Sequence, residues 1–238
     1  HIELLSEVCV LQSLLNSVQS LSPPDGHLLV AGDIWINQSQ CHDLQGTRPE
    51  YVLHPSAAGL ALGLADAGLA VTLVGFVGDD ELADAIELPL RAAGVASDLL
   101  HIKQWQTFTD TALDSLASAD DALDAQGRRR RRHKDERALP IDGMSEYEAH
   151  LQNRAERYMR NAGAVVLVDY DLGSIAEPRA LVFVAKQLGI PCVAALGDER
   201  GIDNYTKADH RLNLAGLSLA DAVADVVSSL PSAMAPSS

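Results

Sequence analysis

Apolar residues follow two periodicities, which alternate along most of this chain. Short, nearly continuous apolar runs at residues 27–33, 70–78, 164–169 and 190–196 predict buried β-strands. Apolar residues spaced three or four positions apart predict helices over residues 3–20, 55–68, 79–93, 145–161, 177–188 and 218–230. Because strands alternate with helices, we expect a three-layer α/β fold, with a mostly parallel sheet and helices on both faces.

Ligands of such sheets bind beyond the carboxyl ends of the strands. Polar residues and glycines follow several of the predicted strands, and they are expected along this one edge: Asp33, Gly75, Gly78, Asp79, Asp169 and Asp171. Acidic residues at the start of a helix favour its dipole and cap its amides. We therefore interpret Asp79 and Asp80 as a helix cap in preference to a cation site.

The pattern divides the chain into three parts. Residues 1–24 form an amphipathic helix, whose expected role is to cover the sheet edge; docking against a neighbouring subunit is the alternative. Residues 25–230 form a single α/β domain, interrupted at about residues 103–137 by a polar, arginine-rich insertion. The Pro/Ser/Ala-rich residues 231–238 are expected to be a flexible tail.

Composition narrows the possible functions. The 238 residues include 18 Lys and Arg against 33 Asp and Glu, a formal net charge of −15, which disfavours a general nucleic-acid binder. The sequence contains no uncharged apolar stretch long enough to predict a membrane span. Its three scattered cysteines and its histidines show no metal-ligand spacing, so we expect no metal site. We expect a cytoplasmic protein in a reducing compartment.

One basic run stands out in this acidic sequence. Five consecutive arginines are candidate partner-binding residues: Arg128, Arg129, Arg130, Arg131 and Arg132. The planar guanidinium suits carboxylate recognition, so a protein partner is a reasonable target. The alternatives are contact with the acidic surface of the same chain and, less favoured, a nucleic acid.

Several segments, in order, resemble the ribokinase-like (PfkB-type) carbohydrate kinases, above all the kinase domain of bifunctional heptose-phosphate kinase/ADP-heptose synthases. They are Leu29–Asp33, Leu62–Asp80, Ala93–Val95, Val165–Gly173, Leu188–Pro191 and Asp203–Tyr205. The resemblance implies a ribokinase-like fold over about residues 25–230. It also implies that Asp33, Asn37 and Asp169 correspond to substrate-facing positions.

Departures from the family pattern point away from catalysis. Asn37 stands where the family has a sugar-binding aspartate, and Ser56-Ala57 replaces a glycine pair that lets the backbone approach the substrate. Gly216 stands where a glutamate is expected near the nucleotide and magnesium. The sequence also ends before the family's anion hole and catalytic aspartate, so we expect a truncated fold without its carboxyl-terminal half. Phosphoryl transfer depends on those positioning and charge-stabilising groups.

The resemblance and its departures together favour a non-catalytic, carbohydrate-kinase-like protein. Its expected role is that of a structural or regulatory subunit of an oligomer or larger complex, with vestigial substrate contacts, no catalytic residues and no cofactor. The first alternative is a sugar or sugar-phosphate kinase that uses ATP and Mg²⁺, completed by another chain. A module that binds a sugar without chemistry is a third, weaker possibility.

Overall fold

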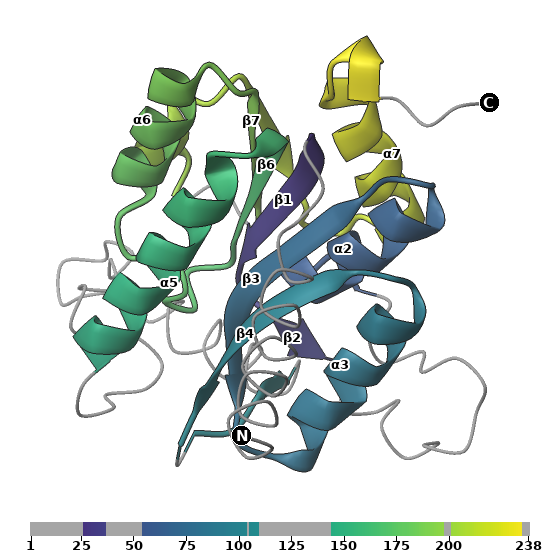
Figure 1. The fold of residues 1–238 in the computed structure, drawn as a ribbon, viewed down its shortest axis with the longest axis vertical. Coiled ribbons are helices and arrows are strands. Elements are labelled where there is room, and N and C mark those ends of the chain that lie inside the picture. The colour runs from purple at the N-terminus through teal and green to yellow at the C-terminus, as the bar shows by residue number, and fades with distance from the viewer. Residues whose placement is uncertain (1–25, 37–53, 104, 110–143, 198–200, 235–238) are drawn as a thin grey trace, which may run out of the picture.

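The structure is a computed structural model that describes residues 26–36, 54–103, 105–109, 144–197 and 201–234 (Figure 1). Its centre is a six-stranded sheet in the order β4-β3-β1-β6-β7-β8, and every neighbouring pair is parallel. The strands are β1 (His27–Gly32), β3 (Val71–Gly78), β4 (Ala96–Ile102), β6 (Ala162–Asp169), β7 (Cys192–Leu196) and β8 (His210–Asn213). This confirms the predicted mostly parallel α/β sheet.

Helices cover both faces of the sheet (Figure 1). One face carries α2 (Ala57–Asp66), α3 (Glu81–Ala92) and α7 (Leu219–Ser229), and the other carries α5 (Met144–Met159) and α6 (Pro178–Leu188). Strand β1 is buried throughout because successive side chains enter the two cores in turn. Leu28 and Val30 face one core, and Leu29 and Ala31 face the other.

Side-chain caps fix the starts of three helices on one face of the sheet. The hydroxyl of Ser56 accepts a hydrogen bond from the Gly59 amide at 3.4 Å, and the carboxylate of Asp80 accepts one from the Ala83 amide at 3.0 Å. Ser218 caps α7 in the same way, through the amide of Asp221 at 3.2 Å. The predicted capping role of Asp80 is confirmed.

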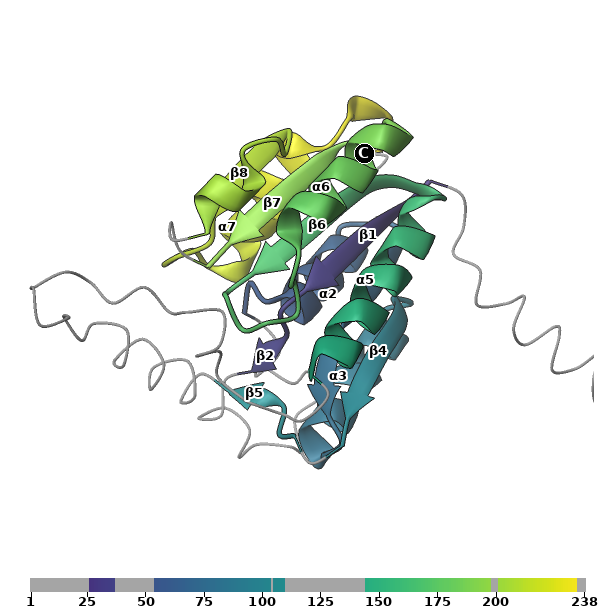
Figure 2. The ribbon, with the colours of Figure 1, turned by 90° about the vertical axis from the view of Figure 1, so that its left-hand side faces the viewer.

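Four strands do not correspond to predicted elements: β4, β8 and a separate parallel pair, β2 (Trp35–Ile36) and β5 (Phe108–Thr109). Figure 2 shows β2 and β5 beside each other beyond the carboxyl end of β1. Strand β5 lies within the predicted polar insertion, yet Trp105, Thr107 and Phe108 are buried. Residues 105–109 therefore pack into the domain, in contrast to the prediction; residues 110–137, with the arginine run, lie outside the described residues.

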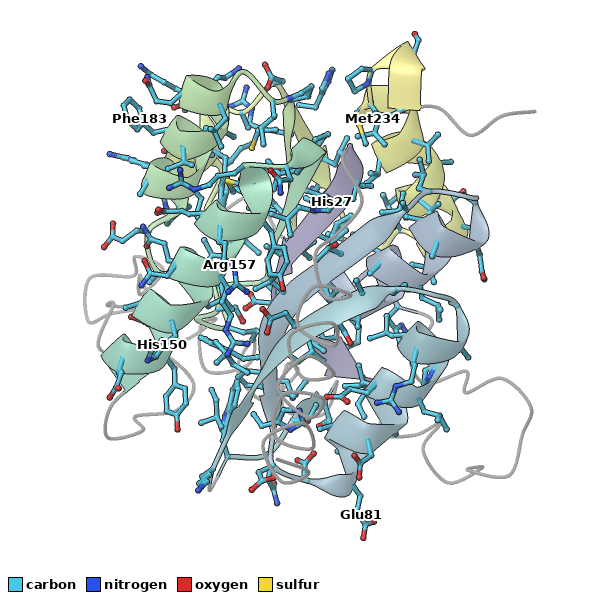
Figure 3. The ribbon with its side chains drawn as sticks, in the orientation of Figure 1. His27, Glu81, His150, Arg157, Phe183 and Met234 are labelled. Carbon is cyan, nitrogen blue, oxygen red and sulfur yellow. The ribbon has the colours of Figure 1, made fainter. Side chains whose placement is uncertain are left out.

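The described carboxyl-terminal residues also pack onto the domain. After α7, a short 3₁₀ helix, η5 (Ser232–Met234), places Met234 against the core between the sheet and α2, α3 and α7. Figure 3 shows Met234 at the end of the molecule opposite Glu81, which begins α3 after the carboxyl end of β3. Residues 231–234 thus differ from the flexible tail that the sequence predicts. The predicted helix at residues 3–20 lies outside the described part of the chain.

In the described ranges, no helix combines the length and the apolar character needed to cross a bilayer.

Candidate functional site at the carboxyl end of the sheet

The centre of the sheet contains a topological switch point between β1 and β6. The chain leaves β1 toward α2 on one face, whereas it leaves β6 toward α6 on the other face. In open parallel sheets, the crevice at such a point is the usual ligand site. Asp33 follows β1 directly and Asp169 ends β6. The structure therefore brings these two predicted site residues together at the carboxyl edge of the sheet, which we call the rim.

The carboxylate of Asp33 is fully buried, and backbone amides surround it. Its Oδ2 atom accepts hydrogen bonds from the amides of Tyr170 at 2.7 Å and Leu172 at 3.1 Å. Its Oδ1 atom accepts one from the amide of Ser174 at 3.1 Å, and the Ser174 side chain is a further partner. Burial raises the pKa of Asp33 above its ordinary value, and these hydrogen bonds offset only part of that rise.

The backbone of Asp33 joins two further elements to this loop. Its amide donates to the carbonyl of Val168 at 2.9 Å, and its carbonyl accepts from the amide of Ala57, the first residue of α2, at 2.9 Å. Gly32 makes the close approach of β1 to β6 possible. A Cβ atom at Gly32 would lie 1.9 Å from the Val168 carbonyl oxygen, and its φ of +141° is one that other residues rarely adopt.

Asp169 holds the same loop from the other side. Its Oδ1 atom accepts from the amide of Asp171 at 2.8 Å, and its Oδ2 atom accepts from the hydroxyl of Tyr205 at 2.7 Å. Tyr205 belongs to the 3₁₀ helix η4 (Ile202–Tyr205) and is fully buried. Burial, followed by the charge of Asp169, raises the pKa of Tyr205 well above its usual value. Asp171 adopts a left-handed backbone with φ +60°, a conformation that aspartate tolerates better than most residues.

Tyr170 fills the space between the loops that follow β1 and β7. Its hydroxyl donates to the carbonyl of Pro55 at 3.1 Å, and its ring lies so close to Gly197 that a Cβ atom there would be 2.2 Å from it. Trp35 meets the Tyr170 ring edge-on with centroids 5.7 Å apart, and it stacks on His54 at 4.9 Å. Aromatic side chains of the chain itself therefore occupy this part of the rim.

A second carboxylate clamp lies at the end of β3. Asp80 accepts hydrogen bonds from the amide of Thr107 at 2.7 Å and from its hydroxyl at 2.8 Å. The Thr107 hydroxyl in turn accepts from the amide of Gly78 at 3.0 Å. These bonds tie the segment before β5 to the start of α3.

The structure locates only some of the predicted site residues. Asp33 and Asp169 come together, whereas Asn37 and the run Arg128–Arg132 lie outside the described residues. Contact of Asp33, Asn37 or Asp169 with a sugar stays a prediction. Among the residues that the structure describes, no three His, Cys, Asp or Glu side chains are grouped as a metal site requires.

Sequence reasoning missed three side chains that complete the rim: Tyr170, Tyr205 and Thr107. Tyr170 stood between two aspartates just after a buried strand, which was the available signal. Tyr205 lies in the Asp203–Tyr205 segment of the family resemblance, but nothing in that segment indicates a contact with Asp169, and Thr107 carries no signal in the sequence.

The fold and its rim place this chain in the class of three-layer α/β domains with a parallel sheet. No family model matches the chain. Its sequence is similar to the Bifunctional protein HldE of Marinomonas sp. (strain MWYL1), with 29% identity over 178 residues, 70% of this chain and 35% of that protein. HldE of Alkalilimnicola ehrlichii is 30% identical over 199 residues, 77% of this chain and 38% of the relative. These relatives confirm the resemblance to the bifunctional heptose-phosphate kinase/ADP-heptose synthases.

The chain spans little more than a third of the length of these two relatives. Solved structures with a similar fold include a carbohydrate kinase from Agrobacterium tumefaciens, at 14% identity and a TM-score of 0.47, with 78% of this chain and 60% of that one covered. A fructokinase from Xylella fastidiosa is 18% identical with a TM-score of 0.45, covering 78% of this chain and 58% of the other. Similarity at this level carries no argument about substrate or activity.

Proposed function

We propose that this chain is a non-catalytic, carbohydrate-kinase-like protein that acts as a structural or regulatory subunit of an oligomer or larger complex. One observation carries the proposal: Asp33, which follows β1 at the switch point, is bound by backbone amides of the chain itself. The Asp33 carboxylate is buried and bonded to three amides, so it presents no acceptor to a sugar hydroxyl without opening the loop. Tyr170 and Trp35 occupy the adjoining space.

The HldE relatives favour one alternative, a sugar or sugar-phosphate kinase that uses ATP and Mg²⁺ at a site completed by another chain. Asn37 and Asp169 would then face the sugar. In that case the loop at Tyr170 would have to move, because its side chain now fills the rim.

Isothermal titration with ATP-Mg²⁺ and with heptose and hexose phosphates separates these two functions. For the chain alone, we expect no heat that indicates a dissociation constant below the millimolar range. Micromolar binding of ATP-Mg²⁺, or release of ADP with a sugar phosphate present, would overturn the non-catalytic proposal. Asn37→Asp restores the family's carboxylate, so under the kinase alternative it tightens sugar binding; Asn153→Asp, on the exposed side of α5, is the control for added charge.

The subunit role is tested by native mass spectrometry and by pull-down from the source cells. We propose the run Arg128–Arg132 as the partner contact, and two five-residue variants test it. Replacing all five arginines by glutamine removes charge, whereas replacing them by lysine keeps charge but loses the bidentate fork. If a carboxylate-bearing protein binds the fork, both variants lose the partner. A monomer without partners at all would contradict the subunit role.

A further inference from the structure

The loop between β6 and α6 has the form of an anion-binding site. The amides of three alternate residues, Tyr170, Leu172 and Ser174, converge on a single carboxylate. Successive backbone amides that point into one concavity bind anions in many proteins. Here the bound anion is a side chain of the same protein, that of Asp33.

Asp33 is distant in sequence from the loop that binds it, so it acts on this loop as an internal ligand. Between 137 and 141 residues separate it from the three amides that it binds. Its carboxylate has no contact with water, and no ion pair among the described residues includes it. Within the described residues, the groups that bind the Asp33 carboxylate are backbone amides and the Ser174 side chain, and none of them is a cation.

We propose that residues 170–174 form a binding site for a small carboxylate, which Asp33 fills as an internal ligand. The site holds the β6–α6 loop in place and, through the backbone of Asp33, joins it to α2. Removal of the carboxylate leaves the three amides without an acceptor, and a free anion of the same size can then bind them and hold the loop again. The inference does not rest on the proposed function, because it concerns the loop whether or not the chain has a catalytic role.

Chemical rescue of Asp33→Ala tests this site. The substitution removes one CO₂⁻ group, and formate supplies a group of that size. We expect a large fall in the thermal unfolding midpoint in sodium chloride. Sodium formate at equal ionic strength and pH 7 should raise the midpoint again, by about 3–6 °C for each tenfold increase above its dissociation constant. Phosphate, which is larger and tetrahedral, should rescue less than formate.

Two control variants make the result specific. Asp33→Asn fills the space but turns an amide NH₂ toward the loop amides, so we expect it to be destabilised and insensitive to formate. Asp209→Ala removes another carboxylate that accepts from a backbone amide, that of Cys192 at 2.9 Å, but this carboxylate is partly exposed and also pairs with Lys186. We expect formate and chloride to act equally on it.

Equal midpoints of Asp33→Ala in formate and chloride would overturn the proposal, as would an Asp33→Asn variant as stable as the parent protein. Phosphate rescue that exceeds formate rescue would overturn the assignment to a small carboxylate. If Asp33→Ala does not fold in chloride, the readout is recovery of its circular dichroism on refolding in formate. Recovery in formate alone supports the site, and equal failure in both salts refutes it.

Discussion

Aspartates near the two ends of the strands bind different kinds of partner. At the carboxyl end, Asp33 and Asp80 accept hydrogen bonds from backbone amides of distant loops, and Asp169 accepts one from the amide of Asp171, two residues further along the chain. Toward the amino end, the carboxylates form ion pairs with cationic side chains, although Asp209 also accepts a hydrogen bond from the amide of Cys192. Asp98 in β4 pairs with Arg154 and Arg157 and accepts from the hydroxyl of Tyr158 at 2.9 Å, while Asp209, just before β8, pairs with Lys186.

The difference decides what each group can do for the fold. A carboxylate bonded to amides fixes the backbone path of a loop, and because amides carry no net charge the interaction depends little on salt. A carboxylate paired with flexible cationic side chains on a half-exposed surface joins elements but leaves their backbones free, and salt screens it. Figure 3 shows Arg157 on α5, within reach of the edge of the sheet. The carboxyl rim is thus held by hydrogen bonds to backbone amides, whereas the region around Asp98 and Asp209, which we call the seam, is held by ion pairs.

Gly32→Ala breaks the rim most severely. Its new Cβ atom would lie 1.9 Å from the carbonyl oxygen of Val168, a backbone atom that cannot move without separating β1 from β6. We expect a loss of about 4 kcal/mol or more in the free energy of unfolding, or no folded protein. Gly26→Ala is the matched control, because φ is +79° there but nothing lies within 4 Å. It should cost roughly 1–2 kcal/mol in urea denaturation, and equal losses for both variants would contradict the contact.

Tyr205→Phe and Tyr158→Phe compare a buried tyrosine–aspartate hydrogen bond at the rim with a similar bond at the seam. The buried hydroxyl of Tyr205 donates to Asp169 at 2.7 Å, so its removal should cost about 1.5–3 kcal/mol of unfolding free energy. Tyr158→Phe removes a similar bond to Asp98, which keeps Arg154 and Arg157 as partners, and should cost less than about 1 kcal/mol. The reverse order in urea denaturation would refute the contrast.

The sequence predicts the central elements because both faces of their strands are covered. β1, β3, β6 and β7 are long apolar runs, and the helices between them have clear periodicity and caps. β4 was missed because Asp98 and His101 interrupt its apolar residues, as suits a strand at the sheet edge. β8 has four residues, three of them exposed, and offers no pattern at all.

The site is predictable only in part for a related reason. Asp33 and Asp169 follow from strand ends in a parallel sheet, which is a local signal. Their partners do not follow, because Tyr205 and Thr107 reach the rim by tertiary packing of loops. The role of an aspartate at a strand end also depends on what it binds, which the sequence does not show. Such an aspartate is typical of a ligand contact, whereas the structure shows Asp33 bound to amides of its own chain.

Ionic strength should separate the two regions further. Asp98→Asn weakens pairs with Arg154 and Arg157, each worth about 0.2–1 kcal/mol at low salt. This loss should nearly vanish at about 1 M NaCl, where the Debye length falls to about 3 Å. Asp80→Asn disturbs bonds to the amide and hydroxyl of Thr107, and its cost should be the same in about 0.1 M and 1 M NaCl. Equal salt sensitivity of both variants would contradict the distinction.

The smallest expected effect is a pH dependence of the seam. Hydrogen bonding to Lys186 lowers the pKa of Asp209 below its ordinary value, so the carboxylate contributes stability above its unfolded-state pKa of about 3.9. That contribution is lost as pH falls through the lowered pKa, because protonation then removes the charge. Asp209→Asn should therefore lie below the parent protein at pH 6, by less than about 1 kcal/mol for a partly exposed pair, and approach it in strong acid. Urea denaturation between pH 6 and pH 3 measures the difference in unfolding free energy between Asp209→Asn and the parent protein. A difference that widens in acid would mean that the neutral carboxyl, and not the ion pair with Lys186, stabilises the start of β8.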